Sequence, residues 1–295
     1  MSEGPEVKRT ADKIAEAILG KSIVDLQGKA IEHRLRGKIV GSKVLSVDTY
    51  GKNIIIHFSG GIFLRNHMMM WGKWRIYDRS KYDEGLARAP PRRSRKIELN
   101  SSQTAIMEKD VRLDSRVRLT IITNEAVLIE FNGPILQFST DDPVEKEPIK
   151  SLGPDCLNQQ IFDVEEIKQR LSIYSKGKKL LISDALLNQK IIAGIGNKYK
   201  SEILFVCKIN PFKSISQLNL MQQNSLFKEI PKLLKYGYEN AGRTRQLLIG
   251  EPNSWNTRYW VFRRAGKECW ICKTKIKSEK KLTKRPTFWC PYCQK

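Results

Sequence analysis

The chain opens with a stretch in which apolar side chains recur at helical spacing. Over residues 5–19 these positions fall on one face of a helix. Pro5 suits the first turn, where its missing N–H is not needed, and Gly20 is a residue type that commonly follows a helix end. We expect an amphipathic helix whose apolar face packs into a core. Its apolar positions are Val7, Ala11, Ile14, Ala15 and Ile18.

Residues 21–140 have a different pattern, in which short alternating or β-branched runs are separated by Gly and Asn turns. Such spacing is typical of an antiparallel sandwich or barrel. We expect strands in SKVLSVDTYG, NIIIHF, GIFLRNH, RVRLTIIT and AVLIEFNG.

Helical periods replace this pattern after the charged, proline-containing segment DDPVEKEP (141–148), which has the composition of a linker. A loop rich in Gly, Pro, Asn and Ser (249–257) then precedes the C-terminus. The predicted helical segments are VEEIKQRLSIY, KLLISDALLNQKIIAG, NKYKSEILFVC and LMQQNSLFKEIPKLLKYGYENAG.

The charge of the chain favours a polyanionic partner. Lys and Arg number 53 against 31 Asp and Glu, which gives a formal charge of +22 and a pI near 9.8. Nucleic acid fits this excess better than an acidic membrane does. No apolar run approaches the roughly 20 residues that span a bilayer, and the charged first 20 residues hold no signal-peptide core. We expect a reducing intracellular compartment, either the cytoplasm with its nucleoid or the nucleus.

Four of the six cysteines form two Cys-x-x-Cys pairs, CWIC and CPYC, at a spacing typical of zinc sites. Each pair places two thiolates at one side of a tetrahedron, and the hairpin between them returns the second pair to complete it. With four sulfur ligands the metal would be structural. A thioredoxin-like redox role is the alternative. The expected zinc ligands are Cys269, Cys272, Cys290 and Cys293.

The segment between the two cysteine pairs is strongly basic, and Glu279 is its only acidic residue. A solvated hairpin is one interpretation, but neighbouring cations repel one another unless an anion lies against them. We therefore expect this zinc finger to contact phosphates.

A glycine turn, Gly194-Ile195-Gly196, lies between two predicted helices. A dinucleotide-binding fingerprint would need a preceding strand and a third glycine where Tyr199 stands. A tight helix-turn-helix fits better, in which the glycines allow a close backbone approach to a phosphate and Asn197 caps the next helix. A purely structural helical hairpin is the alternative.

Six segments in order resemble the formamidopyrimidine-DNA glycosylase and endonuclease VIII family of base-excision repair enzymes. They are EGPEV, GKN with Lys52, LGPDCL, DALLNQKIIAGIGNKYKSEIL, VFRRAGKECWIC and RPTFWCPYCQ. The resemblance implies an α+β multidomain fold. Its parts would be an N-terminal helix with an antiparallel β-sandwich (1–140), a linker (141–150), a helix-two-turn-helix domain (151–248) and a four-cysteine zinc finger (259–295).

The resemblance also implies a reaction at the N-terminus. The damaged nucleotide is turned out of the duplex, because C1′ of its sugar cannot be attacked while the base is stacked. The N-terminal amine attacks C1′ and forms a Schiff base, and elimination then cleaves the strand. By position the amine belongs to Ser2 after removal of Met1. Glu3 moves protons and Glu6 assists in the same pocket.

Ser2 departs from the family, which usually carries proline at this place. A serine amine is primary and can still form an imine, so we expect catalysis at a reduced rate. A simpler interpretation is an ordinary helix lead-in, with Glu3 and Glu6 favoured by the helix dipole.

DNA contacts follow from the same resemblance. Lys52, Asn197 and Arg285 align with residues that bind phosphates around the everted nucleotide, and an arginine suits a two-pronged contact of this kind. The segment HMMMWG (67–72) aligns with the loop whose apolar residue fills the space left by the base. The core is the usual place for such side chains, yet an apolar wedge is what unstacking requires. We expect Met70 to be the wedge, beside His67, Met69 and Trp71.

The substrate class is indicated by a second departure. Formamidopyrimidine glycosylases carry Arg and Phe in a further loop, and the corresponding stretch here, EFNGPILQF, has neither in the expected DPRRFG-like form. Oxidised pyrimidines are therefore favoured, with oxidised purines and formamidopyrimidines as the alternative. A lesion-binding protein without catalysis and a zinc-ribbon protein of RNA or transcription also remain open. The expected partner is damaged DNA. We expect the protein to be a monomer and not to bind a membrane.

Overall fold

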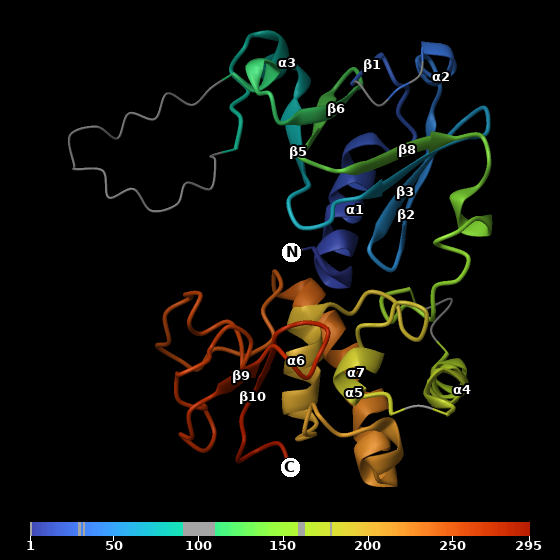
Figure 1. Ribbon diagram of the computed structural model, residues 1–295. Coiled ribbons are helices and arrows are strands. Elements are labelled where there is room, and N and C mark those ends of the chain that lie inside the picture. Colours follow the sequence, from blue (N-terminus) through green and yellow to red (C-terminus); the bar gives the residue numbers. More distant parts are fainter. Residues whose placement is uncertain (1, 29–30, 32, 91–109, 159–162, 178) are drawn as a thin grey trace. The chain divides into compact units, whose positions relative to one another are not determined.

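The computed structural model describes residues 2–295, with the exception of residues 29–30, 32, 91–109, 159–162 and 178 (Figure 1). Its contacts group the chain into two compact units. The first contains Asp12–Val47 and Ile55–Asp142, and the second contains Ser2–Ala11, Asp48–Ile54 and Pro143–Lys295. Two short pieces from early in the sequence therefore belong with the C-terminal half. The linear domain boundaries given above remain predictions.

Two four-stranded sheets form most of the first unit. One has the order β1-β6-β7-β5 with antiparallel neighbours, and the other has the order β2-β3-β4-β8, in which β4 and β8 pair antiparallel. The α+β fold class expected from the sequence is confirmed. The strands are β1 (Asp25–Gln27), β2 (Val44–Tyr50), β3 (Asn53–Phe58), β4 (Ile62–His67), β5 (Lys73–Asp78), β6 (Val117–Ile122), β7 (Ala126–Phe131) and β8 (Ile135–Ser139). Two short helices, α2 (His33–Ile39) and α3 (Arg79–Asp83), accompany them.

The strands that the sequence pattern identified are those with the most buried side chains. Every residue of β7 is buried, and so are five of the six residues of β3. β-branched and aromatic side chains suit such packed, pleated surfaces. The pattern did not identify β1, β5 and β8. In β5 only Trp74 is buried, so no apolar run marks the strand.

The helices of the second unit share one hydrophobic core, in which α6 and α7 supply the largest part. Tyr199 and Ile203 of α6 and Leu226 and Ile230 of α7 are fully or almost fully buried there. Asn219 caps α7 by accepting the N–H of Gln222, which explains where that helix begins. The helices are α1 (Gly4–Ile18), whose first part belongs here, α4 (Val164–Ser175), α5 (Ile182–Ala185), α6 (Asn197–Val206) and α7 (Leu220–Glu239).

The predicted helix in residues 179–194 is wrong over most of its length. Only α5 is helical, and turns follow it. The side chain of Gln189 bonds this turn internally, donating to the Ile195 carbonyl at 2.8 Å and accepting the Gly194 N–H at 3.1 Å. Ile191 and Ile192 are buried, so their apolar spacing reflects a buried turn and not a helix face.

The C-terminal finger is a small hairpin on its own apolar cluster. Strands β9 (Lys277–Glu279) and β10 (Thr287–Trp289) pair antiparallel. Phe205 at the end of α6 packs with Val261, Ile276 and two buried cysteines. Short 3₁₀ turns occur at Val111–Leu113, Pro143–Glu145 and Ile215–Gln217. Among the helices described, none has the length and apolar character to cross a membrane.

Candidate functional site

The carboxylate of Glu3 caps a helix that lies 193 positions later in the chain. It accepts the backbone N–H groups of Gly196 at 3.0 Å, Lys198 at 2.9 Å and Tyr199 at 3.2 Å. These are donors of the first turn of α6, for which Gly196 at the N-cap provides no side chain. The prediction that Asn197 caps this helix is wrong, because Asn197 is its first residue and its side chain bonds to Pro286 and Lys200. Only 1% of Glu3 is exposed. A buried negative charge is stabilised here by three donors and by the positive end of the helix dipole.

The glycine turn makes room for this N-terminal segment. Gly4 donates its N–H to the Gly194 carbonyl at 2.8 Å, and a Cβ on Gly4 would lie 3.1 Å from that oxygen. A Cβ on Gly196 would lie 2.3 Å from the carboxyl carbon of Glu3. Gly194 also has a φ of 87°, which disfavours other residues. The close approach required of the glycines is therefore to Gly4 and Glu3, and a phosphate contact at this turn stays a prediction.

Glu6 lies beside Glu3 and has a cationic partner that the sequence did not reveal. Lys198 forms a short ion pair with the Glu6 carboxylate and donates to the Gly242 carbonyl at 3.2 Å. The other Glu6 oxygen accepts the N–H of Glu3 at 3.2 Å. Burial, with Glu6 nearby, raises the pKa of Tyr199, so its hydroxyl stays protonated as a donor to Glu6 at 3.4 Å.

Lys52 is held against the same turn. Its ammonium donates to the Ile195 carbonyl at 2.6 Å. Burial lowers the pKa of Lys52, nearby Glu3 opposes that shift, and Arg285 adds to it. The preceding Gly51 donates its N–H to Asp155 at 2.8 Å. Asp155, from the LGPDCL segment, was not singled out by the sequence, and burial raises its pKa to about 6.

Asn197 and Arg285 meet through the backbone of the finger. The amide nitrogen of Asn197 donates to the Pro286 carbonyl at 2.8 Å. The Arg285 side chain is exposed, while its carbonyl accepts the hydroxyls of Thr283 at 2.7 Å and Thr287 at 3.1 Å. An exposed guanidinium on a fixed backbone is suited to bind a phosphate.

Residues 67–72, the wedge loop, belong to the first unit. Met69, Met70 and Trp71 are 47%, 49% and 59% exposed, so the alternative that places this segment in the core is wrong for these three residues, whereas Met68 is buried at 3% exposure. Met69 has a φ of 50° and donates its N–H to Nδ1 of His67 at 3.1 Å. The loop thus holds apolar side chains in water, and its insertion into DNA remains a prediction.

The four clustered cysteines are placed as a tetrahedral metal site requires. All four sulfur atoms lie within 4.8 Å of one another, with Cys269 and Cys293 at 3.9 Å and Cys272 and Cys290 at 3.4 Å. A tetrahedron with metal–sulfur bonds of about 2.3 Å has sulfur–sulfur edges of about 3.8 Å. The donor set and its spacing therefore fit a closed metal site.

Comparison with known proteins agrees with this geometry. The model of the formamidopyrimidine-DNA glycosylase N-terminal domain matches residues 1–117, and that of the formamidopyrimidine-DNA glycosylase H2TH domain matches residues 152–247. Endonuclease 8 of Salmonella agona is 30% identical over 301 residues, and that of Pectobacterium atrosepticum is 26% identical over 296 residues; each match covers 100% of both chains. The chain belongs to the formamidopyrimidine-DNA glycosylase and endonuclease VIII family of base-excision repair enzymes.

Solved structures of this family share the fold. A Lactococcus lactis Fpg bound to DNA with an abasic site is 22% identical, covers 100% of both chains and has a TM-score of 0.76. The same protein bound to DNA containing Fapy-dG gives a TM-score of 0.74 at 22% identity, with 99% of both chains covered. At this identity the likeness establishes the fold alone.

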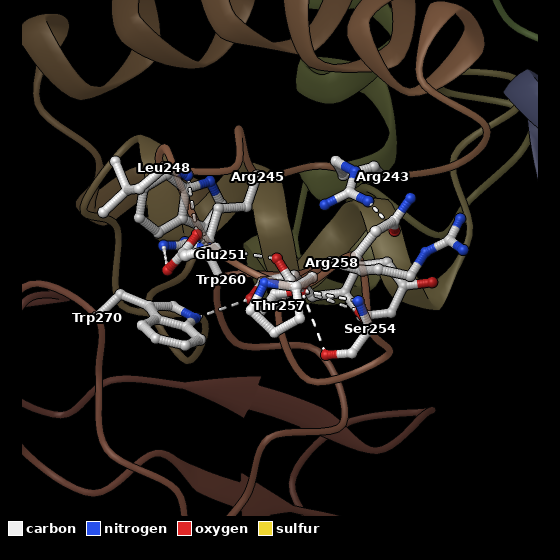
Figure 2. Close-up of polar contacts among 12 residues, drawn as sticks. Arg243, Arg245, Leu248, Glu251, Ser254, Thr257, Arg258, Trp260 and Trp270 are labelled. Atoms are coloured by element: carbon white, nitrogen blue, oxygen red, sulfur yellow. Dashed lines mark hydrogen bonds and ion pairs between the residues drawn. The ribbon is translucent and has the colours of Figure 1, made fainter.

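Residues 243–258, which include the predicted loop 249–257, are held by arginine contacts that the sequence did not predict (Figure 2). The two terminal guanidinium nitrogens of Arg245 each donate to Glu251 at 2.8 Å, and Leu248 donates its N–H to the same carboxylate at 2.9 Å. These bonds, led by those from Arg245, lower the pKa of Glu251 to about 2. Arg245 also lies 4.1 Å from the ring centre of Trp270 and 5.5 Å from that of Trp260. The several Arg and Trp residues in GRTRQLLIGEPNSWNTRYW were the feature of the sequence that could have indicated these contacts.

Glu202 fastens the finger to α6. It is fully buried and accepts the N–H groups of Trp260 at 2.8 Å, Val261 at 2.9 Å and Phe262 at 2.7 Å, together with the Thr244 hydroxyl. Burial raises the pKa of Glu202 despite these donors. A single carboxylate thus joins α6 to the segment that leads into the metal site.

Ser2, the expected nucleophile, is partly buried and directly precedes Glu3. Met1 lies outside the described residues. The structure therefore brings residue 2, Glu3, Glu6 and Lys52 to the start of α6, where Asn197 and the finger hairpin also meet. The roles given to these residues remain predictions.

Proposed function

We propose that this chain is a bifunctional DNA glycosylase and abasic-site lyase that removes oxidised bases, pyrimidines in preference. The observation that carries the proposal is the burial of Glu3 on the α6 N-terminus, directly beside residue 2. This arrangement holds an acid–base group and a backbone nitrogen side by side. Lys52, within electrostatic reach of Glu3 and Arg285, adds positive charge where a DNA phosphate would lie.

In the proposed reaction the free α-amine of Ser2 attacks C1′ of an everted nucleotide. The bond from C1′ to the base breaks as the new C–N bond forms, and the base leaves with a proton. Glu3 moves protons between the sugar oxygen, the amine and the base. Its Oε2 accepts two backbone N–H groups and its Oε1 accepts one, so Oε1 retains a lone pair for this task. Opening of the sugar gives the Schiff base, and loss of a C2′ proton expels the 3′ phosphate.

DNA would be held by the finger, the turn before α6 and the wedge loop. In this proposal Lys52, Asn197 and Arg285 bind phosphates of the damaged strand, while Met70 fills the vacated stack beside His67, Met69 and Trp71. Zinc on the four cysteines would supply a structural crosslink for the finger and no chemistry. The protein would act on damaged DNA as a monomer.

Borohydride trapping on a duplex with an abasic site tests the enzymatic proposal. Reduction of the Schiff base leaves a permanent adduct, which we expect peptide mapping to place on Ser2. A protein that retains Met1 is the matched control, because its Ser2 nitrogen is an amide, and an adduct there should be absent. An adduct on a lysine would reject Ser2 as the nucleophile.

A lesion-binding protein without catalysis is the second candidate, favoured by serine in the place of the usual proline. It would bind the abasic duplex tightly and yield no adduct at all. Release of bases from duplexes with one oxidised pyrimidine or one formamidopyrimidine then decides the substrate class. Faster release of the formamidopyrimidine would contradict the pyrimidine preference.

A further inference from the structure

Lys200 of α6 is a fully buried lysine that the proposed reaction does not use. The residue is 0% exposed. Its ammonium donates to Oδ1 of Asn197 at 2.8 Å and to the Thr287 hydroxyl at 2.8 Å. Within the described residues it forms no ion pair. A buried ammonium without a contacting carboxylate is costly, and an apolar side chain would satisfy packing at lower cost. The charge at this position therefore requires another explanation.

The two bonds of Lys200 connect it to two of the three proposed phosphate contacts, one directly and one through a hydroxyl. Asn197 belongs to the first turn of α6 and donates to Pro286 of the finger. Thr287 belongs to β10 and donates its hydroxyl to the carbonyl of Arg285 at 3.1 Å. Lys200 thus bonds directly to one contact residue and, through one hydroxyl, to the backbone of the other.

The ammonium also fixes which way the Asn197 amide points. An ammonium has only donors, so the atom facing it must be the amide oxygen. The NH2 group is then directed to the finger, where it donates to the Pro286 carbonyl. A residue without a donor at position 200 would remove one of the two bonds that hold the amide in this orientation, and only the bond to Pro286 would remain.

Resting on the DNA-binding function proposed above, we propose that Lys200 is a positioning residue. It holds Asn197 and the backbone of Arg285 as one phosphate-binding unit. Its ammonium also adds a positive charge next to Asn197 and Thr287. Its partner is the DNA backbone, reached through Asn197 and Arg285 and not by direct contact.

If Lys200 has this role, its protonation is coupled to DNA binding, and the affinity for DNA should depend on pH. Burial lowers the pKa of Lys200 to about 8; Asp184 of α5 and Glu3 oppose the shift, and Arg285 of the hairpin adds to it. A phosphate bound to Asn197 and Arg285 would favour the charged ammonium of Lys200 and raise its pKa. DNA binding would then take up a proton above pH 8, and affinity would fall as the pH rises from 7 to 9, by at most tenfold per pH unit.

The test compares the full-length, metal-loaded wild type with Lys200→Met and with Lys228→Met, a control on the exposed face of α7. The measurement is the Kd for a duplex with a non-cleavable abasic-site analogue from pH 6.5 to 9. We expect Lys200→Met to bind about tenfold more weakly or worse at pH 7. We also expect its loss of affinity toward pH 9 to be smaller than that of the wild type. Lys228→Met should follow the wild type.

A folded, metal-loaded Lys200→Met protein with wild-type affinity and pH profile would overturn the role of Lys200. If Lys200→Met does not fold, Lys200→Arg replaces it, because arginine keeps charge and donors and does not titrate below pH 9. It should bind as the wild type does at pH 7 and lose less affinity toward pH 9. A wild-type pH profile in Lys200→Arg would reject the linkage. Failure of wild-type Schiff-base trapping would instead count against the catalytic function alone.

Discussion

At the scale of the residue, Glu3 has a structural task that sequence reasoning did not foresee. It was expected either to move protons or to lead into a helix, and it caps α6 from the far end of the chain. The two tasks use the same atoms, because the backbone donors that stabilise the carboxylate also fix its position. Its burial keeps water from competing for those donors.

Glu3→Gln separates catalysis from binding. The amide has nearly the same volume and cannot take up a proton, so base release should be abolished while lesion binding persists. One donor of α6 would face an NH2 group, and we expect a stability loss of about 1–3 kcal/mol. Single-turnover base release, a binding titration and urea unfolding measure the three effects. Glu16→Gln, at an exposed site of α1, is the control, and normal base release by Glu3→Gln would contradict the proposal.

Glu130 of β7 predicts a pH effect on stability. One oxygen accepts the Gly133 N–H at 2.8 Å, and the other has no partner among the described residues. Burial raises the pKa of Glu130 from 4.5 to about 7, against weaker opposing effects from its backbone donors and Arg118. Its contribution to stability is thus complete below pH 4.5 and is lost as the pH rises through 7.

Glu130→Gln, which carries no charge at any pH, should therefore gain stability over the wild type above pH 7. The gain should approach, at most, about 3 kcal/mol. Urea unfolding at pH 5.5 and pH 8.5 measures it. Exposed Glu84→Gln serves as the control, and a difference from the wild type that does not change with pH would refute the shift.

At the scale of the element, the sequence predicted those strands and helices whose hydrophobic pattern follows directly from burial in a regular element. The strands β3, β6 and β7 carry β-branched runs because they are buried, and α4, α6 and α7 lie where helical periods were seen. The four cysteines were found because metal geometry fixes their spacing. The helix predicted over residues 179–194 was wrong because the apolar residues of a buried turn have the same spacing as those on one face of a helix. Lys198, Asp155 and the Arg245–Glu251 pair could not be foreseen, since their partners are set by tertiary contacts.

Metal removal should unfold the finger as an element. Cys269 and Cys290 are buried in the cluster with Phe205 of α6, so loss of the crosslink exposes that cluster. We expect Cys290→Ser, or chelation, to lower the metal content and to weaken binding to the abasic-site duplex. Elemental analysis and a binding titration check both. Cys207→Ala, at a buried cysteine outside the metal site, should keep the metal; lesion binding that survives verified metal loss would remove the finger from the interface.

At the scale of the whole molecule, the charge of +22 does not by itself identify the DNA-binding residues. Many lysines and arginines are engaged internally, as Lys198 is with Glu6, Arg170 with Glu166 and Arg245 with Glu251. A cation that already has a partner contributes little to the binding of a polyanion. The exposed Arg285 is a better candidate, because its backbone is fixed and its guanidinium faces water.

Arg285→Ala should therefore weaken DNA binding and reduce the slope of log Kd against log salt by about one unit. The loss should be similar for damaged and intact duplexes, because a phosphate contact carries no base information. Titrations between 50 and 300 mM salt, roughly the range in which such slopes are read, provide the measurement. Lys228→Ala on α7 is the control. An unchanged slope in Arg285→Ala would show that the finger does not reach phosphate.

The capping of α6 by Glu3 has a consequence for the order of events on the ribosome. Translation at about 5–20 residues per second separates the emergence of Glu3 from that of Gly196 by about 10–40 s. Throughout that interval Glu3 lacks its donors on α6, and the start of the chain is accessible to the enzymes that trim or acetylate nascent polypeptides. For the proposed reaction, the Ser2 amine is thus exposed to those enzymes before the pocket that would use it has been synthesised.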